Sequence, residues 1–344
     1  FVSEGLCLPI IRTLLEKDIE TEPAAVINRI EELMVKHSEN GTLSAMMDYA
    51  ILVARFYETA LGLGSLTLNT ADEYVHRYQT DYYLTDQYYR QATELYFKID
   101  PTSELFDSIQ KVKLSIDQNY SKLCNRINLE WTRCLKETGG MDSVHLLRQD
   151  DFYDEKIKPI QKKVAVIVSD ALRYEVAVEL MQQLAKEKHI ATLTPYLAML
   201  PTETKYCKPA LLPHHSLGML GTEMLVDGTV LNTTDQRTAH LCKYKEGAVC
   251  MRYEEVMNGD LSAMRELFKR PLVYIFHDTI DEASHSQSPF EVIAACRKAI
   301  EQLTVLVRRL HATWNVTNVL LTADHGFIYN DQKFEEKDKH SITE

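Results

Sequence analysis

The sequence predicts an α/β protein in which a doubly wound, mostly parallel sheet is preceded by an all-α domain. Apolar residues recur at helical spacing from residue 1 to about 137, whereas short β-branched runs alternate with helical segments after residue 162. Between these regions lie Gly139-Gly140, an acidic run and KIKPIQKK, a composition typical of a linker. We therefore expect a helical domain at 1–138, a linker at 139–162 and an α/β domain at 163–344.

The helical domain is predicted from several apolar stripes. The first follows Pro23 and consists of Val26, Ile27, Ile30, Leu33 and Met34. Further helices are expected at 46–61, 71–83 and 105–135. The segment VHRYQTDYYLTDQYYRQATELYF is rich in tyrosine, which indicates helix packing with the hydroxyls at the surface. An aromatic platform for a ligand is the alternative interpretation.

The α/β domain is predicted from four strand-like runs. KVAVIVS is a continuous apolar, β-branched run, as expected of a strand that is covered on both faces. The four strands are expected at 163–169, 190–197, 272–276 and 316–322, and the helices at 175–188 and 290–311. Asp227-Gly228 lies between apolar pairs in EMLVDGTVL, which is a hairpin signal.

Metal-binding types of side chain follow three of these strands. They are Asp170 after the first, His277, Asp278, Asp281 and His285 after the third, and Asp324 and His325 after the fourth. The remaining strand leads into a PTET turn with Thr202 and Thr204 at a predicted helix start. Open α/β sheets bind ligands outside the carboxyl ends of their strands. Each feature alone could be a helix cap or a turn, but together they predict a site at one edge of the sheet.

The mixture of carboxylates and imidazoles suits zinc, manganese or iron. Two metal ions about 4 Å apart can hold both the attacking and the leaving oxygen of an in-line displacement. A threonine at a helix start can be the nucleophile, because a metal lowers the pKa of its hydroxyl and free backbone N–H groups meet the phosphoryl oxygens. The sequence therefore predicts a two-metal site for phosphoryl or sulfuryl transfer.

Several segments resemble the alkaline-phosphatase superfamily, and more closely its PglZ family, which is known from BREX phage-defence systems alongside a DNA methyltransferase and ATPases. The matching segments are KVAVIVSDALRYEVAVEL, LPTETKYCKPALLPHH, NTTDQRTAHL, FHDTIDEASHS and LLTADHGFIY. The resemblance covers most of residues 70–340, and it implies an alkaline-phosphatase type of fold.

The resemblance also implies roles for individual residues. One metal would be held by Asp170, Asp324, His325 and the nucleophile, and the other by Asp281 and His285. Thr204 matches the P-x-x-T-like nucleophile turn better than Thr202, and Arg173 would either face the phosphate or pair with Glu175. The metals would be zinc, or alternatively manganese. A further histidine ligand is expected beyond residue 344, so we expect the α/β domain to be truncated.

Composition narrows the classes of function. The 344 residues carry a net charge of -12, which disfavours a general nucleic-acid coat but leaves local nucleic-acid binding open. The seven cysteines are scattered without a C-x-x-C, as in a reduced, cytoplasmic protein. The sequence has no run of about 18 apolar residues of the kind that would predict a membrane span. Because Phe1 is not an initiator methionine, we expect an internal fragment of a longer protein.

The leading hypothesis is a metal-dependent hydrolase of phosphate esters, monoester or diester, that works through a phosphothreonine within a phage-defence system. The alternative is an assembly module that keeps the metal site and binds defence-system proteins such as the methyltransferase or ATPase. A nuclease-like phosphodiesterase is the third hypothesis.

Overall fold

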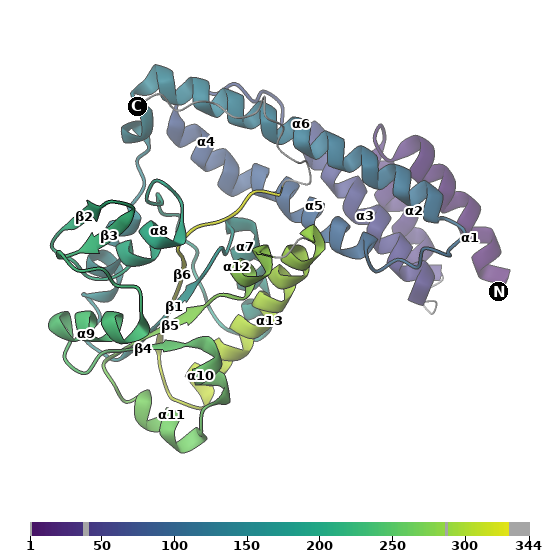
Figure 1. Ribbon diagram of the computed structural model, residues 1–344. Helices are drawn as coiled ribbons and strands as arrows, with labels where there is room; N and C mark the ends of the chain where they lie inside the picture. The colour runs from purple at the N-terminus through teal and green to yellow at the C-terminus, as the bar shows by residue number, and fades with distance from the viewer. Residues whose placement is uncertain (1, 37–40, 286–287, 330–344) are drawn as a thin grey trace.

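The computed structural model describes residues 2–36, 41–285 and 288–329. It contains a helical region followed by a helix-covered sheet, as the sequence predicts (Figure 1). In Figure 1 the helical region, coloured purple to blue, lies beside the face of the sheet that carries α7 and α13. None of the helices among the described residues is both long enough and apolar enough to cross a membrane.

The helical region is built around a large apolar core and a second, smaller apolar cluster. Its helices are α1 (Val2–Thr13), α2 (Pro23–Lys36), α3 (Gly41–Gly62), α4 (Ala71–Arg77), α5 (Tyr83–Tyr96) and α6 (Phe106–Thr138). A capping box at Thr70 starts α4, since the Thr70 side chain accepts from the backbone of Glu73 while the Glu73 side chain accepts from the backbone of Thr70. Gly139 ends α6 with a φ of 100°, a conformation that favours glycine.

The sheet has four parallel strands in the order β4-β5-β1-β6. Their bounds are β1 (Val164–Ser169), β4 (Val249–Arg252), β5 (Leu272–His277) and β6 (Asn318–Ala323). The registers place Ser169 opposite both His277 and Ala323, so β1, β5 and β6 end at the same level. The residues that follow these strands therefore meet at one edge, the geometry on which the predicted site depends.

Alternate residues of the sheet pack into two separate cores. One face packs against α7 (Tyr174–Lys186) and α13 (Pro289–Ala312), with Ala165, Ile167 and Ile275 at its centre. The other face packs against Leu211, Leu212 and residues of α9 (Thr234–Tyr244), with Val166, Val168 and Tyr274 at its centre. The remaining helices are α8 (Thr204–Ala210), α10 (Tyr253–Asn258), α11 (Leu261–Leu267) and α12 (Thr279–Ser284). Both faces are therefore covered, which explains why β1 and β5 are buried along their whole length.

Three of the four predicted strands are present, and the predicted strand at 190–197 is wrong. That stretch runs as a loop with Ile190 fully exposed, and its one ladder contact is a bridge between Leu197 and Arg148. The fourth strand of the sheet is instead β4, which the sequence analysis did not predict. The tight turn predicted at Asp227-Gly228 is present, because Val226 and Thr229 exchange backbone hydrogen bonds of 2.9 and 3.0 Å across it and both turn residues have positive φ. The sequence analysis missed the hairpin that precedes this turn, which is formed by β2 (Leu217–Leu220) and β3 (Glu223–Val226).

Part of the segment predicted as a linker belongs to the core of the α/β region. Phe152, Tyr153 and Ile157 are buried and pack beneath the sheet with Val164 and Val166. This packing joins residues 152–157 to the sheet, while 139–148 connects α6 to it.

The tyrosine-rich segment packs as helix, but the expectation of surface hydroxyls is wrong for several of its residues. The hydroxyl of Tyr78, in this segment, and that of Tyr120, on α6, donate to the two carboxylate oxygens of Asp86 at 2.7 Å each. Tyr89 stacks on Tyr120 with ring centroids 3.9 Å apart. These tyrosines therefore form an internal hydrogen-bonded layer.

Buried ion pairs hold the helical region against the sheet region. Arg90 of α5 is fully buried and bonds to Glu175 at 3.1 Å and to Glu179, both on α7. Arg297 of α13 pairs with Glu94 of α5 at 2.5 Å. Charges that are removed from water need close partners, so the two regions are bound together by paired charges as well as by apolar contact.

Candidate metal centre

Asp170, Asp281 and His325 come together at the carboxyl edge of the sheet. One ligand atom from each lies within 4.8 Å of the other two. Asp170 directly follows β1, His325 lies two residues after β6, and Asp281 is carried in by α12 after β5. The structure thus places ligands from three strand ends at one point.

Asp324 lies beside this group and has an unused oxygen. Its Oδ1 accepts hydrogen bonds from the backbone N–H of Ala171 at 3.2 Å and of His325 at 2.9 Å. Its Oδ2 is buried and has no hydrogen-bond partner among the described residues. Burial, and then the negative charge of Asp170, raise the pKa of Asp324 to about 7. A cation at this position would satisfy the unpaired oxygen and offset the repulsion between the two carboxylates.

The backbone at Ala171 has a strained conformation that serves this contact. Ala171 has a φ of 61°, in the left-handed region that residues with a Cβ adopt at a cost of about 1–2 kcal/mol. Its N–H is the group that donates to Asp324. Such strain is typical of functional sites.

His325 presents one ring nitrogen to the site. Its Nδ1 lies 2.9 Å from the carbonyl of Gly326, to which it donates. Its Nε2 lies 3.2 Å from Oδ1 of Asp170 and 2.8 Å from Oγ1 of Thr204. Burial lowers the pKa of His325, but the hydrogen bond to Asp170 and the charge of Asp324 outweigh it and raise this pKa to about 9. A ring fixed through one nitrogen with the other facing carboxylates is the usual arrangement of a histidine ligand.

Of the two candidate nucleophiles, the structure brings Thr204 to the site. Its Oγ1 lies 3.5 Å from Asp170 Oδ1, in addition to the contact with His325. Thr202 is exposed on the loop before α8. This geometry favours Thr204.

His285 lies at the outer margin of the site. Its side chain is 79% exposed, and its Nε2 is 3.6 Å from Oδ2 of Asp281. Asp281 therefore connects His285 to the inner carboxylates.

Replacement of Asp281 with alanine should weaken metal binding by more than about 10-fold, and replacement of His285 should weaken it less, because Asp281 lies among the converging ligand atoms. Titration of the two variants with manganese, followed by calorimetry, would measure this. Glu282→Ala, on the exposed side of α12, is the control. A larger loss in His285→Ala than in Asp281→Ala would contradict the expected order.

The sequence analysis missed Lys208. This side chain is only 11% exposed, and its ammonium group forms an ion pair with Oδ2 of Asp170. Lys208 lies four residues after Thr204 on α8, so helical spacing places both on one face. This four-residue spacing is the feature of the sequence from which Lys208 could have been predicted as a site residue.

Gln149, in the predicted linker, was also missed. Its amide nitrogen donates to the carbonyl of Asp324 at 2.6 Å, and its oxygen accepts from the backbone of Met199 at 3.0 Å. It therefore holds the segment after β6 against the loop that leads to Thr204. No local pattern distinguishes this glutamine in the sequence.

His277 is held inside the fold. Its Nδ1 accepts from the hydroxyl of Ser169 at 3.0 Å and its Nε2 donates to Gln302 at 3.0 Å. Burial lowers the pKa of His277, which favours the neutral ring that these two bonds require. This network fixes β5 to α13 next to the start of α12.

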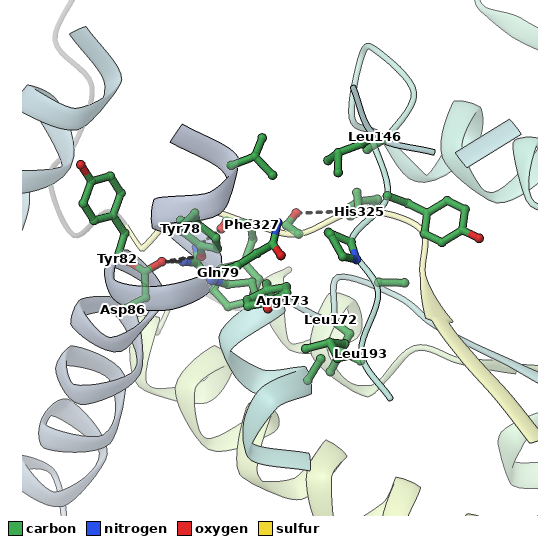
Figure 2. Close-up of a pocket in the computed structure, with 18 of the residues that line it drawn as sticks. Tyr78, Gln79, Tyr82, Asp86, Leu146, Leu172, Arg173, Leu193, His325 and Phe327 are labelled. Carbon is green, nitrogen blue, oxygen red and sulfur yellow. Dashed lines mark hydrogen bonds and ion pairs between the residues drawn. The ribbon is translucent and has the colours of Figure 1, made fainter. Parts of the chain in front are cut away.

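Arg173 is directed towards the helical region (Figure 2). Its guanidinium pairs with Asp86 and, as one of the two predictions has it, with Glu175 at 3.3 Å. It also donates to the carbonyl of Phe327 and lies 4.5 Å from the ring centroid of Tyr329. These contacts favour the structural role of Arg173 over contact with a substrate. Because Phe327 is two residues after His325, Arg173 also fixes the segment that carries the histidine.

A cavity of about 680 Å³ separates the helical region from the end of β6. Figure 2 shows Tyr78 and Tyr82 on one side of it and His325 and Leu172 on the other. The aromatic lining keeps the ligand-platform interpretation of the tyrosine segment open as a prediction.

The residues at the sheet edge fit a divalent metal. Two carboxylates, of Asp170 and Asp281, and an imidazole nitrogen of His325 converge, and beside them one buried oxygen of Asp324 lacks a hydrogen-bond partner among the described residues. This donor set suits zinc or manganese.

Replacement of Asp324 with asparagine should reduce metal affinity by at least about 100-fold, since the loss of even an indirect partner of a ligand costs about 10–100-fold. Elemental analysis of the dialysed variant would measure the loss. Asp278→Asn, beside the site but outside the converging group, is the control. Equal metal content in Asp324→Asn and the parent protein would exclude Asp324 as a ligand.

A parallel sheet that delivers carboxylates and a histidine to a threonine defines an alkaline phosphatase-like domain. The chain belongs to the PglZ family: the sequence model of the BREX system PglZ alkaline phosphatase-like domain matches residues 152–344, more than half of the chain. The chain is 27% identical over 277 residues to the alkaline phosphatase-like protein PglZ of Bacillus cereus (strain H3081.97), a match that covers 76% of this chain and 31% of that protein. It is 33% identical over 230 residues to the alkaline phosphatase-like protein BrxZ of Escherichia coli O9:H4 (strain HS), covering 63% of this chain and 26% of that protein. The chain thus spans less than a third of the length of these relatives.

Proposed function

We propose that this chain carries the catalytic site of a metal-dependent hydrolase of phosphate esters, with Thr204 as the nucleophile. The observation that carries the proposal is the position of the Thr204 hydroxyl, 2.8 Å from His325 and 3.5 Å from Asp170, beside the unpaired oxygen of Asp324. A hydroxyl at the centre of a metal-ligand set is suited to attack an electrophile that the same site binds.

In the proposed reaction the Thr204 oxygen attacks phosphorus and the ester oxygen leaves. Water then cleaves the phosphothreonine, which restores the hydroxyl and releases inorganic phosphate if the substrate was a monoester, or a phosphate monoester if it was a diester. As the resemblance implies, Asp170, Asp324 and His325 would hold one divalent ion and Asp281 and His285 a second, zinc or alternatively manganese. The ions would lower the pKa of the hydroxyl and stabilise the phosphoryl oxygens. The structure supports neighbouring sites, because ligand atoms of Asp281, Asp170 and His325 lie within 4.8 Å of one another. The backbone and side-chain contacts of His325 keep its ring in place beside the nucleophile.

Membership of the PglZ family supports the proposal that this activity serves a BREX phage-defence system. We infer that the whole protein works there with other defence proteins, such as a methyltransferase or an ATPase. The seven free cysteines suit a cytoplasmic location, which we include in the proposal.

The proposal is tested with the full chain after zinc or manganese loading. Metal content is measured by elemental analysis, and turnover is measured with an aryl phosphate monoester and with a dinucleotide diester. We expect bound metal and hydrolysis of at least one ester, and the ratio of the two rates separates a phosphatase from a nuclease-like phosphodiesterase. Bound metal with partner capture but no hydrolysis of either ester would favour the assembly module, and failure to bind either metal would refute the proposal.

A further inference from the structure

Arg237 is a half-buried cation near the metal centre. It lies on α9, and its Nε donates to the carbonyl of Leu231 at 3.0 Å. Within the part of the chain that the structure describes, no carboxylate forms an ion pair with it. Burial lowers the pKa of Arg237, and the charges of Asp170 and Asp324 offset only part of this effect. An unpaired guanidinium in such a position is suited to bind an anion.

Lys208 and Arg237 share one aromatic ring. The Cζ of Arg237 lies 4.8 Å from the ring centroid of Phe276, and the Nζ of Lys208 lies 6.0 Å from it. Phe276 is opposite Val168 in the parallel ladder, one residue before the strand ends that lead to Asp170. The two cations therefore flank the carboxyl ends of β1 and β5.

Lys208 reaches further into the site than Arg237. Its ammonium group contacts Oδ2 of Asp170, and Thr204 lies one helical turn earlier on α8. If both residues had only structural roles, Lys208 would balance the charge of Asp170 and Arg237 would cover the ring of Phe276. Such roles leave the terminal nitrogens of Arg237 unused, and they do not explain why two cations share one ring at the end of β5.

We propose that Lys208 and Arg237 together bind the non-bridging oxygens of the phosphoryl group that Thr204 attacks. The planar fork of a guanidinium matches two oxygens of a phosphate, and an ammonium group matches one. The inference rests on the proposed function, since it names the residues of the same site that recognise the anion.

The test measures the binding of inorganic phosphate to the manganese-loaded full chain by calorimetry, which requires no turnover. Arg237→Ala and Lys208→Ala are each expected to weaken phosphate binding by about 10- to 100-fold. Arg237→Lys should recover part of the loss. The controls are Lys205→Ala, an exposed lysine of the same helix that pairs with Glu203, and Arg308→Ala on the surface of α13. Both controls should bind phosphate like the parent protein.

The outcomes separate this inference from the proposed function. Weaker phosphate binding in Arg237→Ala, with unchanged metal content, supports the pair even if no ester is hydrolysed. Unchanged phosphate binding in both alanine variants overturns the proposal that Lys208 and Arg237 bind the phosphoryl group. It leaves the assignment of Thr204 as the nucleophile intact. If the metal-loaded parent protein binds no phosphate, both are overturned. Because Lys208→Ala could disturb Asp170, Arg237→Lys against Arg237→Ala is the decisive comparison.

Discussion

Replacement of Thr204 with alanine is expected to lower kcat for an activated aryl phosphate by about 10⁴-fold or more, because removal of a nucleophile leaves only binding and electrostatic stabilisation. Metal content should be nearly unchanged, since Asp170, Asp324 and His325 keep their mutual contacts. Steady-state kinetics with elemental analysis of the same preparation would measure both effects.

Two further variants make this result specific. Thr202→Ala should retain activity, because Thr202 is exposed and lies outside the group of contacts, and Thr204→Ser should retain part of it. Mass spectrometry of acid-quenched enzyme should locate phosphate on Thr204. Undiminished turnover by Thr204→Ala would transfer the nucleophilic role to Thr202 or to a water molecule.

Replacement of Arg90 with methionine is expected to destabilise the fold by about 1.5–3 kcal/mol, because Glu175 loses a buried charged hydrogen-bond partner and keeps only its contacts with Arg173 and Tyr329. Both side chains are fully buried, so water cannot compensate. The free energy of unfolding would be obtained from urea denaturation monitored by circular dichroism.

The matched control is Arg133→Met in α6. Arg133 pairs with Glu130 and Glu137, but its side chain is 39% exposed, and such surface pairs contribute less than about 1 kcal/mol. Adding Glu175→Gln to Arg90→Met should recover part of the loss, as expected for coupled residues. Equal denaturation midpoints for Arg90→Met and Arg133→Met would show that the buried pair contributes no more than a surface pair.

The parts of the fold that could be predicted are those with a strong local pattern. The runs of β1 and β5 are long, apolar and β-branched, and α13 has a continuous apolar stripe. The error at 190–197 arose because IATLTPYL alternates polar and apolar residues without a partner strand to pair with. The four-residue strand β4 was missed because VCMR is too short to show a period.

That Asp170, Asp281 and His325 meet at the sheet edge was predictable, because neighbouring parallel strands end at the same level. Residues that are distant in sequence come close together if each follows such a strand. The supporting contacts were not predictable. Gln149 contacts Asp324 across 175 positions, and Arg90 contacts Glu175 across 85. Such pairs depend on how layers pack, and neither residue type nor spacing records that in one sequence. The same holds for Arg173. Its position three residues after Asp170 in the sequence did not reveal that its guanidinium bonds to Asp86.

The ion pairs between α5 and α7 also bear on how the protein can be shortened. A truncated chain that starts at residue 139 would lose Asp86, Arg90 and Glu94. Arg297 would lose its partner, and Arg173 and Glu175 would keep only each other's charge at a newly exposed surface. Such a piece would be prone to aggregate. Versions intended for crystallisation or for transplanting the sheet into another protein should therefore include α5 and the helices that support it.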